Sequence, residues 1–301
     1  MNSKARGSVE MTAAMMISGT IGWFVLYSGQ PAMDVVFWRC AIGAPVLLAV
    51  CAALGLLRGH LTPRLLAFAA LGGVAIVLNW LLLFAAYPRA SISIATAVYN
   101  TQPFILVGLG ALFLGERLTA TKLMWLGLAF AGMLLIVQAK PNAGYIGSDY
   151  LGGILLALGA AFFYALAALV AKKLKGTPPH LIALIQVCVG TLMLVPFANL
   201  AQLPTSASSW GALVTLGVVH TGLMYILLYG AIQKLPTHLT GALSFIYPVV
   251  AILVDFLAFG HQLQPLQLLG TGAILLAAAG MTLGWSLRRV RVPVAGERVS
   301  E

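Results

Sequence analysis

The stretch AVYNTQPFILVGLGALFLGERL, residues 97–118, is an apolar run interrupted by Pro103. Further along the chain, residues 242–263 read ALSFIYPVVAILVDFLAFGHQL, and Pro248 stands 145 positions after Pro103, at the same place in its run. Proline has no backbone N–H and disrupts the interior of a helix, so its presence inside an apolar helix calls for an explanation. Its repetition at one depth predicts two related halves, each containing a bent apolar helix.

The composition predicts that most of the chain lies in lipid. Of 301 residues, 61% are hydrophobic and 8% are charged, and the mean hydropathy is +0.99. Soluble domains carry roughly a quarter charged residues. Lipid offers no hydrogen-bond partners, so each backbone polar group must be satisfied within the protein, which helices achieve segment by segment. The sequence therefore predicts an all-α integral membrane protein.

The net charge of +10 does not predict a nucleic-acid partner. The basic residues are spread thinly between apolar runs and form no stripe with interleaved aromatic residues. The three cysteines, Cys40, Cys51 and Cys188, lie inside apolar runs, where they indicate small core residues rather than a disulfide framework.

Ten apolar runs are long enough to cross a bilayer, whose hydrocarbon core of about 30 Å needs about 20 helical residues. The first run follows Lys4 and Arg6, as in a signal peptide, but it opens a series of similar runs and is interpreted as a retained helix. The predicted spans are 9–27, 35–57, 65–86, 92–114, 122–138, 150–171, 181–200, 211–232, 239–259 and 265–287.

The distribution of lysine and arginine predicts the orientation of these spans, because cytoplasmic loops are enriched in both. With a cytoplasmic N-terminus, fourteen of the seventeen basic residues fall on the inner side, and only Arg89 and Lys140 fall outside. Arg39 is the one basic residue left within a span. Both termini are therefore predicted to be cytoplasmic, including the tail 291–301.

A shift of 145 positions also superimposes several glycines of the two halves, such as Gly72 on Gly217 and Gly115 on Gly260. The predicted repeats are residues 1–145 and 146–290, with five spans each. An odd number of spans forces the second copy to enter the membrane from the opposite side. Such inverted repeats are typical of secondary transporters, whose binding site lies near the midplane.

FWRC at residues 37–40, LGERLT at 114–119 and the ten-span pattern resemble the EamA-type branch of the drug/metabolite transporter superfamily. YNTQP at 99–103, together with many aromatic residues, is similar to YddG-type exporters of aromatic amino acids. The second copy departs from the pattern, because FGHQLQ at 259–264 lacks the glutamate of the first. The resemblance implies multi-pass solute export across a bacterial inner membrane.

The two prolines have two interpretations. Pro103 frees the carbonyl of Tyr99 and Pro248 that of Ser244, and freed acceptors at mid-membrane are tolerated where they meet protein, water or solute. The prolines are then equivalent hinges around which the halves rock. The alternative is that both are packing kinks.

Polar and aromatic residues predict a substrate-binding cavity. Tyr99, Asn100 and Pro103 share one helical stripe, and the shift of 145 places Ser244 and Pro248 on the equivalent stripe. Amide and hydroxyl groups suit the ends of a zwitterion, and aromatic rings suit an apolar side chain. The alternative is that these groups hold helices together or face lipid. The candidate lining residues are Asn79, Trp80, Tyr99, Asn100, Phe163, Tyr164, His220, Tyr225 and Ser244.

Ionisable groups within spans suggest two further roles. His220 is either a proton relay or a hydrogen-bonded packing residue, and no second histidine at metal-ligand spacing accompanies it, so no metal is expected. Arg39 is predicted to pair with Asp34 or Asp255, as an outer gate or as a structural latch.

These features predict a transporter that exports small amphipathic solutes, above all aromatic and other large neutral amino acids, by downhill alternating access. No acidic residue accompanies the polar stripe at mid-membrane, which argues against ion coupling. The alternative is export of other metabolites or drug-like compounds, with proton coupling through His220. No cofactor and no enzymatic activity are expected, because no nucleophile, base and acid share one depth. The sequence leaves open whether the protein is a monomer or a homodimer.

Overall fold

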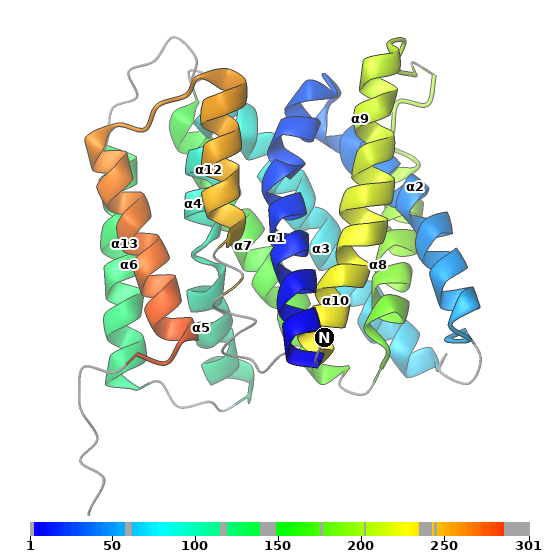
Figure 1. The fold of residues 1–301 in the computed structure, drawn as a ribbon, viewed down its shortest axis with the longest axis horizontal. Helices are drawn as coiled ribbons and strands as arrows, with labels where there is room; N and C mark the ends of the chain where they lie inside the picture. Colours follow the sequence, from blue (N-terminus) through cyan, green and yellow to red (C-terminus); the bar gives the residue numbers. More distant parts are fainter. Residues whose placement is uncertain are drawn as a thin grey trace, which may run out of the picture.

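The structure is a computed structural model and describes residues 3–57, 62–114, 119–138, 149–174, 177–201, 203–234, 243 and 246–285. The elements assigned in these ranges are helices (Figure 1). In chain order they are α1 (Ser3–Tyr27), α2 (Ala32–Ala53), α3 (Pro63–Ala90), α4 (Ile92–Tyr99), α5 (Gln102–Leu114), α6 (Ala120–Gln138), α7 (Tyr150–Lys173), α8 (Pro179–Leu194), α9 (Ala207–Gly217), the π-helix η1 (Val218–Leu223), α10 (Met224–Lys234), α12 (Ile246–Phe259) and α13 (Pro265–Thr282).

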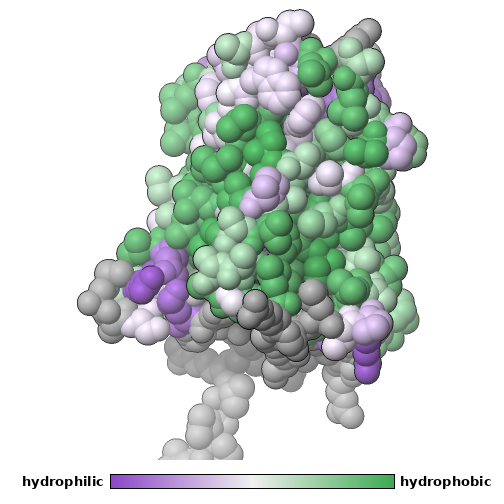
Figure 2. Space-filling model, turned by 90° about the vertical axis from the view of Figure 1, so that its right-hand side faces the viewer, coloured by the Kyte–Doolittle hydropathy of each residue, from purple (hydrophilic) through white to green (hydrophobic). Residues whose placement is uncertain are grey.

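Five of these helical stretches are long and apolar enough to cross a membrane: Ala5–Tyr27, Ala32–Ala53, Pro63–Ala90, Tyr150–Ala167 and Ala207–Leu228. Shorter apolar helices accompany them. Many large apolar side chains point outward, among them Leu192 and Phe197, and Figure 2 shows one face that is mostly hydrophobic between more polar ends. An apolar outer surface of this extent suits lipid rather than water. The predicted all-α membrane class is confirmed at this level.

Helix α3 lies at the centre of the bundle, where it packs against α7 and α8. On one side of the bundle α6 pairs with α13, and on the other α2 packs against α8 and α9 (Figure 1). Helix α1 lies between these groups and contacts α10 and α12. Arg39 of α2, Asn79 of α3 and His220 of η1 are buried in this interior.

The α6–α13 pair depends on two facing glycines. A Cβ atom on Gly132 would lie 2.7 Å from the carbonyl oxygen of Gly270, and a Cβ on Gly270 would lie 2.5 Å from that of Gly132. Helices in lipid associate through close backbone approach at small residues rather than through hydrophobic burial. Only glycine allows the two backbones to come this near.

The predicted span 92–114 is divided into two helices, which corrects the expectation of one bent helix. Helix α4 ends at Tyr99 and α5 begins at Gln102. Pro103 has no backbone N–H and therefore cannot donate to the carbonyl of Tyr99. The N–H of Thr101 bonds to the carbonyl of Val98 at 3.0 Å, a tightened turn that ends α4. The local chemistry of proline thus produces a break rather than a kink.

In the second half, Pro248 lies in the first turn of α12, the described helix that begins at Ile246. Ser244 and the tail 291–301 lie outside the described residues. The two repeats, 1–145 and 146–290, therefore stay a prediction at this stage.

The predicted span 211–232 is continuous but contains the π-helix η1 between α9 and α10. In this segment the N–H of Met224 bonds to the carbonyl of Val219, five residues earlier. A Cβ on Gly43 of α2 would lie 2.5 Å from a methyl group of Thr221, so α2 and η1 are in close contact. π-Helical turns are frequent at functional sites, because the wider turn redirects side chains and carbonyls.

Candidate functional site

Arg39 of α2 has only 1% of its surface exposed. Among the described charged residues, only Asp255 is more deeply buried. Its Nε donates to Thr221 Oγ1 at 2.9 Å, and Nη2 donates to the carbonyl oxygen of His220 at 3.3 Å. Both acceptors belong to η1. Nη1 is buried and has no hydrogen-bond partner in the described part of the chain.

The π-helical turn explains how η1 presents these acceptors. The hydroxyl of Thr221 donates to the carbonyl of Leu216, five residues earlier, at 2.9 Å, so its lone pairs remain available to Arg39. Gly217 lies against Ile42 of α2, where a Cβ would lie 2.5 Å from that side chain. The close approach brings the guanidinium within reach of both groups.

Aromatic rings cover the guanidinium. The Cζ atom of Arg39 lies 4.2 Å from the centroid of the Trp80 ring and 5.8 Å from that of Phe84. Trp80 in turn packs edge to face against Tyr225, with centroids 6.4 Å apart. A cation over an aromatic face is stabilised electrostatically, most strongly where water is excluded.

Asn79 connects three helices beside this cluster. Its Nδ2 donates to Tyr99 Oη at 3.2 Å and to the carbonyl of Ala160 at 2.8 Å. The Tyr99 ring packs edge to face on Tyr164, with centroids 5.9 Å apart. The structure thus brings predicted residues of α3, α4 and α7 together in one polar and aromatic cluster.

The remaining described residues that are predicted to line the cavity do not form hydrogen bonds with Asn79 or Arg39. The Asn100 side chain donates to the carbonyl of Thr96 at 2.7 Å and so serves the end of α4. Phe163 is partly buried and packs edge to face against Phe162, with centroids 5.6 Å apart. Tyr164 is 38% exposed, and Ser244 lies outside the described residues.

The predicted pair between Arg39 and an aspartate is not formed. Asp34 Oδ1 accepts the N–H of Asn199 at 2.9 Å. Asp255 Oδ2 accepts the N–H of Ser93, at the start of α4, at 2.9 Å, while Oδ1 meets Nδ1 of His261 at 2.9 Å. Asp34 also lies five residues before Arg39, which places the two on different faces of α2. Asp34 thus accepts a backbone N–H from the segment after α8, and Asp255 accepts one from the first turn of α4.

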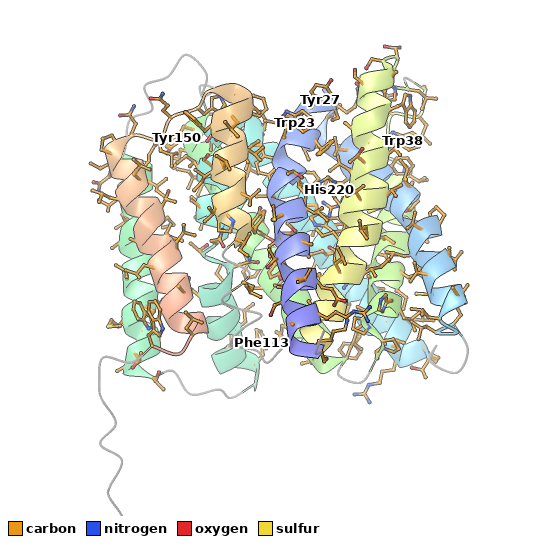
Figure 3. The ribbon with its side chains drawn as sticks, viewed as in Figure 1. Trp23, Tyr27, Trp38, Phe113, Tyr150 and His220 are labelled. Atoms are coloured by element: carbon orange, nitrogen blue, oxygen red, sulfur yellow. The ribbon has the colours of Figure 1, made fainter. Side chains whose placement is uncertain are left out.

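His220 is held at both ring nitrogens (Figure 3 labels it beside α1). Nδ1 lies 3.2 Å from the carbonyl of Thr215, and Nε2 lies 2.9 Å from Thr20 Oγ1. Thr20 Oγ1 also lies 2.8 Å from the carbonyl of Ile17. A carbonyl only accepts, so Nδ1 carries a proton, and the Thr20 hydroxyl either donates to a neutral ring or accepts from a charged one and donates to Ile17. The network therefore accommodates both protonation states.

Sequence reasoning missed Thr221 and Thr20, the two hydroxyl groups that hold Arg39 and His220. The available signal was VHTG at residues 219–222, in which glycine follows polar residues inside an apolar run. The π-helical turn that gives those residues their role has no comparable sequence pattern. No group of histidine, cysteine and acidic residues that could hold a metal ion occurs among the described residues.

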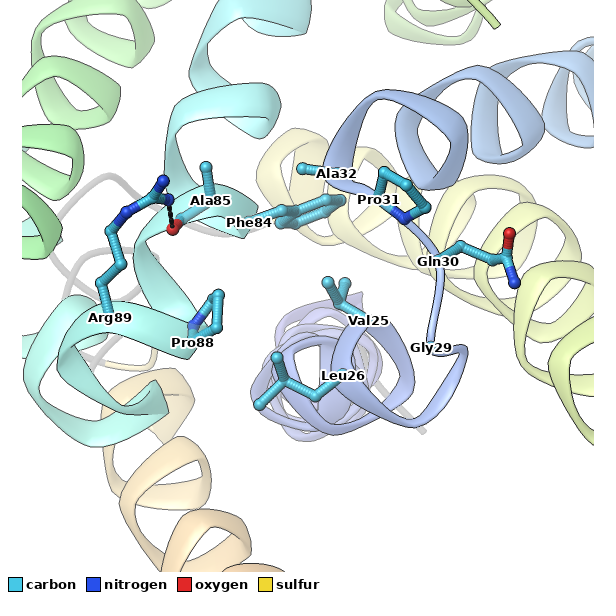
Figure 4. A pocket seen from close by; sticks show the side chains of 10 residues that line it. All are labelled: Val25, Leu26, Gly29, Gln30, Pro31, Ala32, Phe84, Ala85, Pro88 and Arg89. Carbon is cyan, nitrogen blue, oxygen red and sulfur yellow. Dashed lines mark hydrogen bonds between the residues drawn. The ribbon is translucent and has the colours of Figure 1, made fainter. Parts of the chain in front are cut away.

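A pocket of about 370 Å³ opens beside the Arg39 cluster, at the end of the bundle where α1 turns into α2 (Figure 4). Phe84, whose ring contacts the Arg39 guanidinium, lines this pocket together with Val25 and Pro88. At the rim, Arg89 Nη1 donates to the carbonyl of Ala85 at 2.6 Å. Phe84 is thus shared between the lining of this pocket and the aromatic rings around Arg39.

Comparison with known proteins gives two matches to one family, described as the EamA-like transporter family, over residues 6–138 and 151–283. The chain is similar to a protein of Bacillus subtilis (strain 168) described as an uncharacterized transporter, YxxF. The two are 30% identical over 298 residues, which cover 98% of this chain and 94% of the relative.

A second relative is the threonine/homoserine exporter RhtA of Escherichia coli (strain K12). It is 28% identical over 195 residues, which cover 64% of this chain and 63% of that protein. A solved crystal structure aligns with a TM-score of 0.65 and 20% identity, and the alignment covers 96% of this chain and 99% of that one. At this identity the likeness shows a shared fold. The two named relatives are a transporter and an exporter rather than enzymes.

Proposed function

This chain belongs to the EamA-like transporter family, and on that premise we propose that it exports neutral amino acids, above all aromatic and other large ones, across the bacterial inner membrane. It is a multi-pass membrane protein of a transporter family, and its relatives include named exporters. The proposal concerns the solute, the membrane, the topology and the mechanism.

The observation that carries the proposal is the cluster of Asn79, Tyr99 and Tyr164 next to Trp80 and Tyr225. These side chains offer neutral hydrogen-bonding groups beside aromatic rings. A neutral amino acid needs polar partners for its ammonium and carboxylate groups and an apolar or aromatic surface for its side chain. The exporter RhtA, named for threonine and homoserine, supports amino acids as the solute class.

The proposed topology has ten spans in two inverted five-helix repeats, with both termini in the cytoplasm. Two successive family matches, over residues 6–138 and 151–283, support a duplication close to the predicted halves. We propose that the halves bend at the break between α4 and α5, just before Pro103, and at the equivalent Pro248 in the first turn of α12. Alternating access by rocking of repeats needs such positions near the middle of the membrane.

We propose downhill export, because the described residues around Asn79 and Arg39 contribute no acidic group to the cluster. The second candidate is proton-coupled export of other metabolites or drug-like compounds through His220. The observation that favours it is the Thr20 hydroxyl, which can serve either protonation state of the imidazole. Coupling would require that the two states differ in affinity for the solute or for one conformation.

Counterflow in proteoliposomes tests the proposed function. Vesicles loaded with unlabelled phenylalanine should accumulate external labelled phenylalanine transiently, and a panel of unlabelled solutes should compete in proportion to their affinity. Large neutral amino acids should compete best. Vesicles without the protein are the control. The absence of counterflow for every amino acid, combined with exchange of a different solute class, would overturn the proposal.

A further inference from the structure

Arg39 lies in the interior of the bundle and has no counter-charge among the described residues. It is 1% exposed, and the ion pairs found among the described residues involve Arg6, Arg89, Lys234 and His261, but not Arg39. A cation removed from water is costly unless an anion or a full set of hydrogen bonds replaces its hydration. The cost of removing the Arg39 cation from water must therefore be offset by more than its uncharged neighbours.

The neutral neighbours supply only some of the hydrogen bonds that the guanidinium needs. A guanidinium carries five N–H groups. Nε uses its N–H on Thr221, and Nη2 uses one on the carbonyl of His220, whereas Nη1 is buried without a partner in the described structure. Buried donors in native proteins are nearly always paired. The unused donors of Nη1 thus mark a position that is complete only when an acceptor is bound.

The surroundings of Arg39 select the kind of acceptor. Trp80 and Phe84 cover the guanidinium, and Tyr225 packs against Trp80, so the group beside Nη1 is flanked by aromatic surface. A planar guanidinium edge matches a carboxylate through two parallel hydrogen bonds and is shaped poorly for a spherical ion. A carboxylate with an adjoining apolar or aromatic side chain fits this combination.

We infer that Arg39 binds the carboxylate of the transported solute through Nη1 and the second N–H of Nη2. This inference rests on the proposed function and narrows it, because it makes a carboxylate, rather than an ammonium group, the feature required of every solute. Thr221 and the carbonyl of His220 are positioning groups that hold Nε and Nη2. The pocket of about 370 Å³ is lined by Phe84, one of the aromatic rings around this guanidinium.

Solute analogues test the inference on the unaltered protein. Phenylalanine and 3-phenylpropionate both carry the carboxylate, whereas phenylalaninamide carries the ring and the amine without it. The two carboxylates should raise the melting temperature of the purified protein and inhibit labelled phenylalanine counterflow. The amide should be weaker by about tenfold or more in both assays, since it leaves a buried cation unpaired. Equal potency of the amide and the acid would overturn the inference.

Variants of Arg39 test whether this residue causes the preference for a carboxylate over an amide. Arg39→Gln should reduce the preference for acid over amide to near unity, and Arg39→Lys should keep part of it, because the charge remains without the planar fork. Thr221→Val should weaken the preference while retaining Arg39. Arg64→Gln, which removes an exposed arginine at the start of α3, is the matched control and should keep the full preference. An unchanged preference in both Arg39 variants would overturn the inference.

The two readouts separate this inference from the proposed function. Carboxylate-dependent stabilisation lost in Arg39→Gln, without counterflow of any amino acid, would support the Arg39 site and contradict amino-acid export. Counterflow of phenylalanine with equal inhibition by the amide would support export and contradict the Arg39 site. If Arg39→Gln does not fold, the comparison of Arg39→Lys with the unaltered protein carries the test.

Discussion

At the scale of single residues, two asparagines on neighbouring helices have different roles. The Asn79 amide reaches Tyr99 on α4 and Ala160 on α7, so it joins three helices. The Asn100 amide bonds to the carbonyl of Thr96, in the helix that Asn100 caps. Both are buried, but only Asn79 contributes to the polar and aromatic cluster. Tertiary neighbours, rather than residue type, distinguish a group that lines a cluster from one that ends a helix.

The hydroxyl of Tyr99 offers a test of this cluster. Tyr99→Phe keeps the ring against Tyr164 and removes the acceptor of the Asn79 amide, which costs about 1 kcal/mol for one hydrogen bond. We expect roughly fivefold weaker apparent affinity for phenylalanine in counterflow, with a small change in melting temperature. Tyr27→Phe, an exposed tyrosine at the end of α1, is the matched control. A large loss of stability with normal affinity would favour a packing role.

A variant of His220 distinguishes downhill export from proton-coupled export. His220→Gln retains a donor and an acceptor in the position between Thr20 and Thr215, but it cannot change charge. We expect the variant to keep most of the flux, and the steady-state distribution of solute to be unaffected when an imposed pH gradient is collapsed. Concentrative transport driven by a proton gradient, and lost in His220→Gln, would make the histidine the coupling site.

At the scale of elements, close backbone approach holds the α6–α13 pair together. Gly132 faces the carbonyl of Gly270, so an added Cβ would force the two helices apart. Gly127, five residues earlier on α6, has no atom within 4 Å of its would-be Cβ. The same helix therefore contains one glycine that packing requires and one that it does not.

This difference predicts opposite effects of the same substitution. Gly132→Ala should lower stability by about 1–3 kcal/mol, because overpacking displaces backbone. Gly127→Ala should be neutral or stabilise the helix by up to about 1 kcal/mol, since alanine favours helix. Thermal unfolding of both variants in one detergent checks the pair. Equal melting temperatures would show that the α6–α13 contact contributes little.

At the scale of the whole molecule, the placement of charges predicts the orientation in the membrane. Fourteen of the seventeen lysines and arginines fall on one side of the predicted spans. Lys173, at the end of α7, belongs to that side, and Ser208, at the start of α9, belongs to the other. The excess of basic residues predicts that Lys173 faces the cytoplasm.

Cysteine labelling in whole cells tests this orientation. In a variant without Cys40, Cys51 and Cys188, a cysteine at position 208 should react with a membrane-impermeant maleimide, and one at 173 should react only after the cells are opened. Both positions are exposed on the protein, so accessibility reports the side of the membrane. The reverse labelling pattern would contradict both the orientation and the cytoplasmic termini.

The sequence by itself determined the membrane class and the approximate helices. Both follow from local properties, namely apolar composition and the length needed to cross a bilayer. The disruption at Pro103 was predictable for the same reason, since the missing N–H acts on the carbonyl four residues earlier. That the disruption divides the span into α4 and α5, as found, depends on how the turn at Thr101 packs.

Only the tertiary structure decided the partners of the buried charges. Arg39 binds Thr221 and the carbonyl of His220, which lie more than 180 residues away on a π-helical turn. Asp255 meets the start of α4 and His261, not the arginine predicted for it. Spacing along a helix shows which residues share a face, but not which helix that face meets or how the two are rotated. Those relations come from packing of the entire bundle, and they leave Nη1 of Arg39 without a hydrogen-bond partner in the described part of the chain.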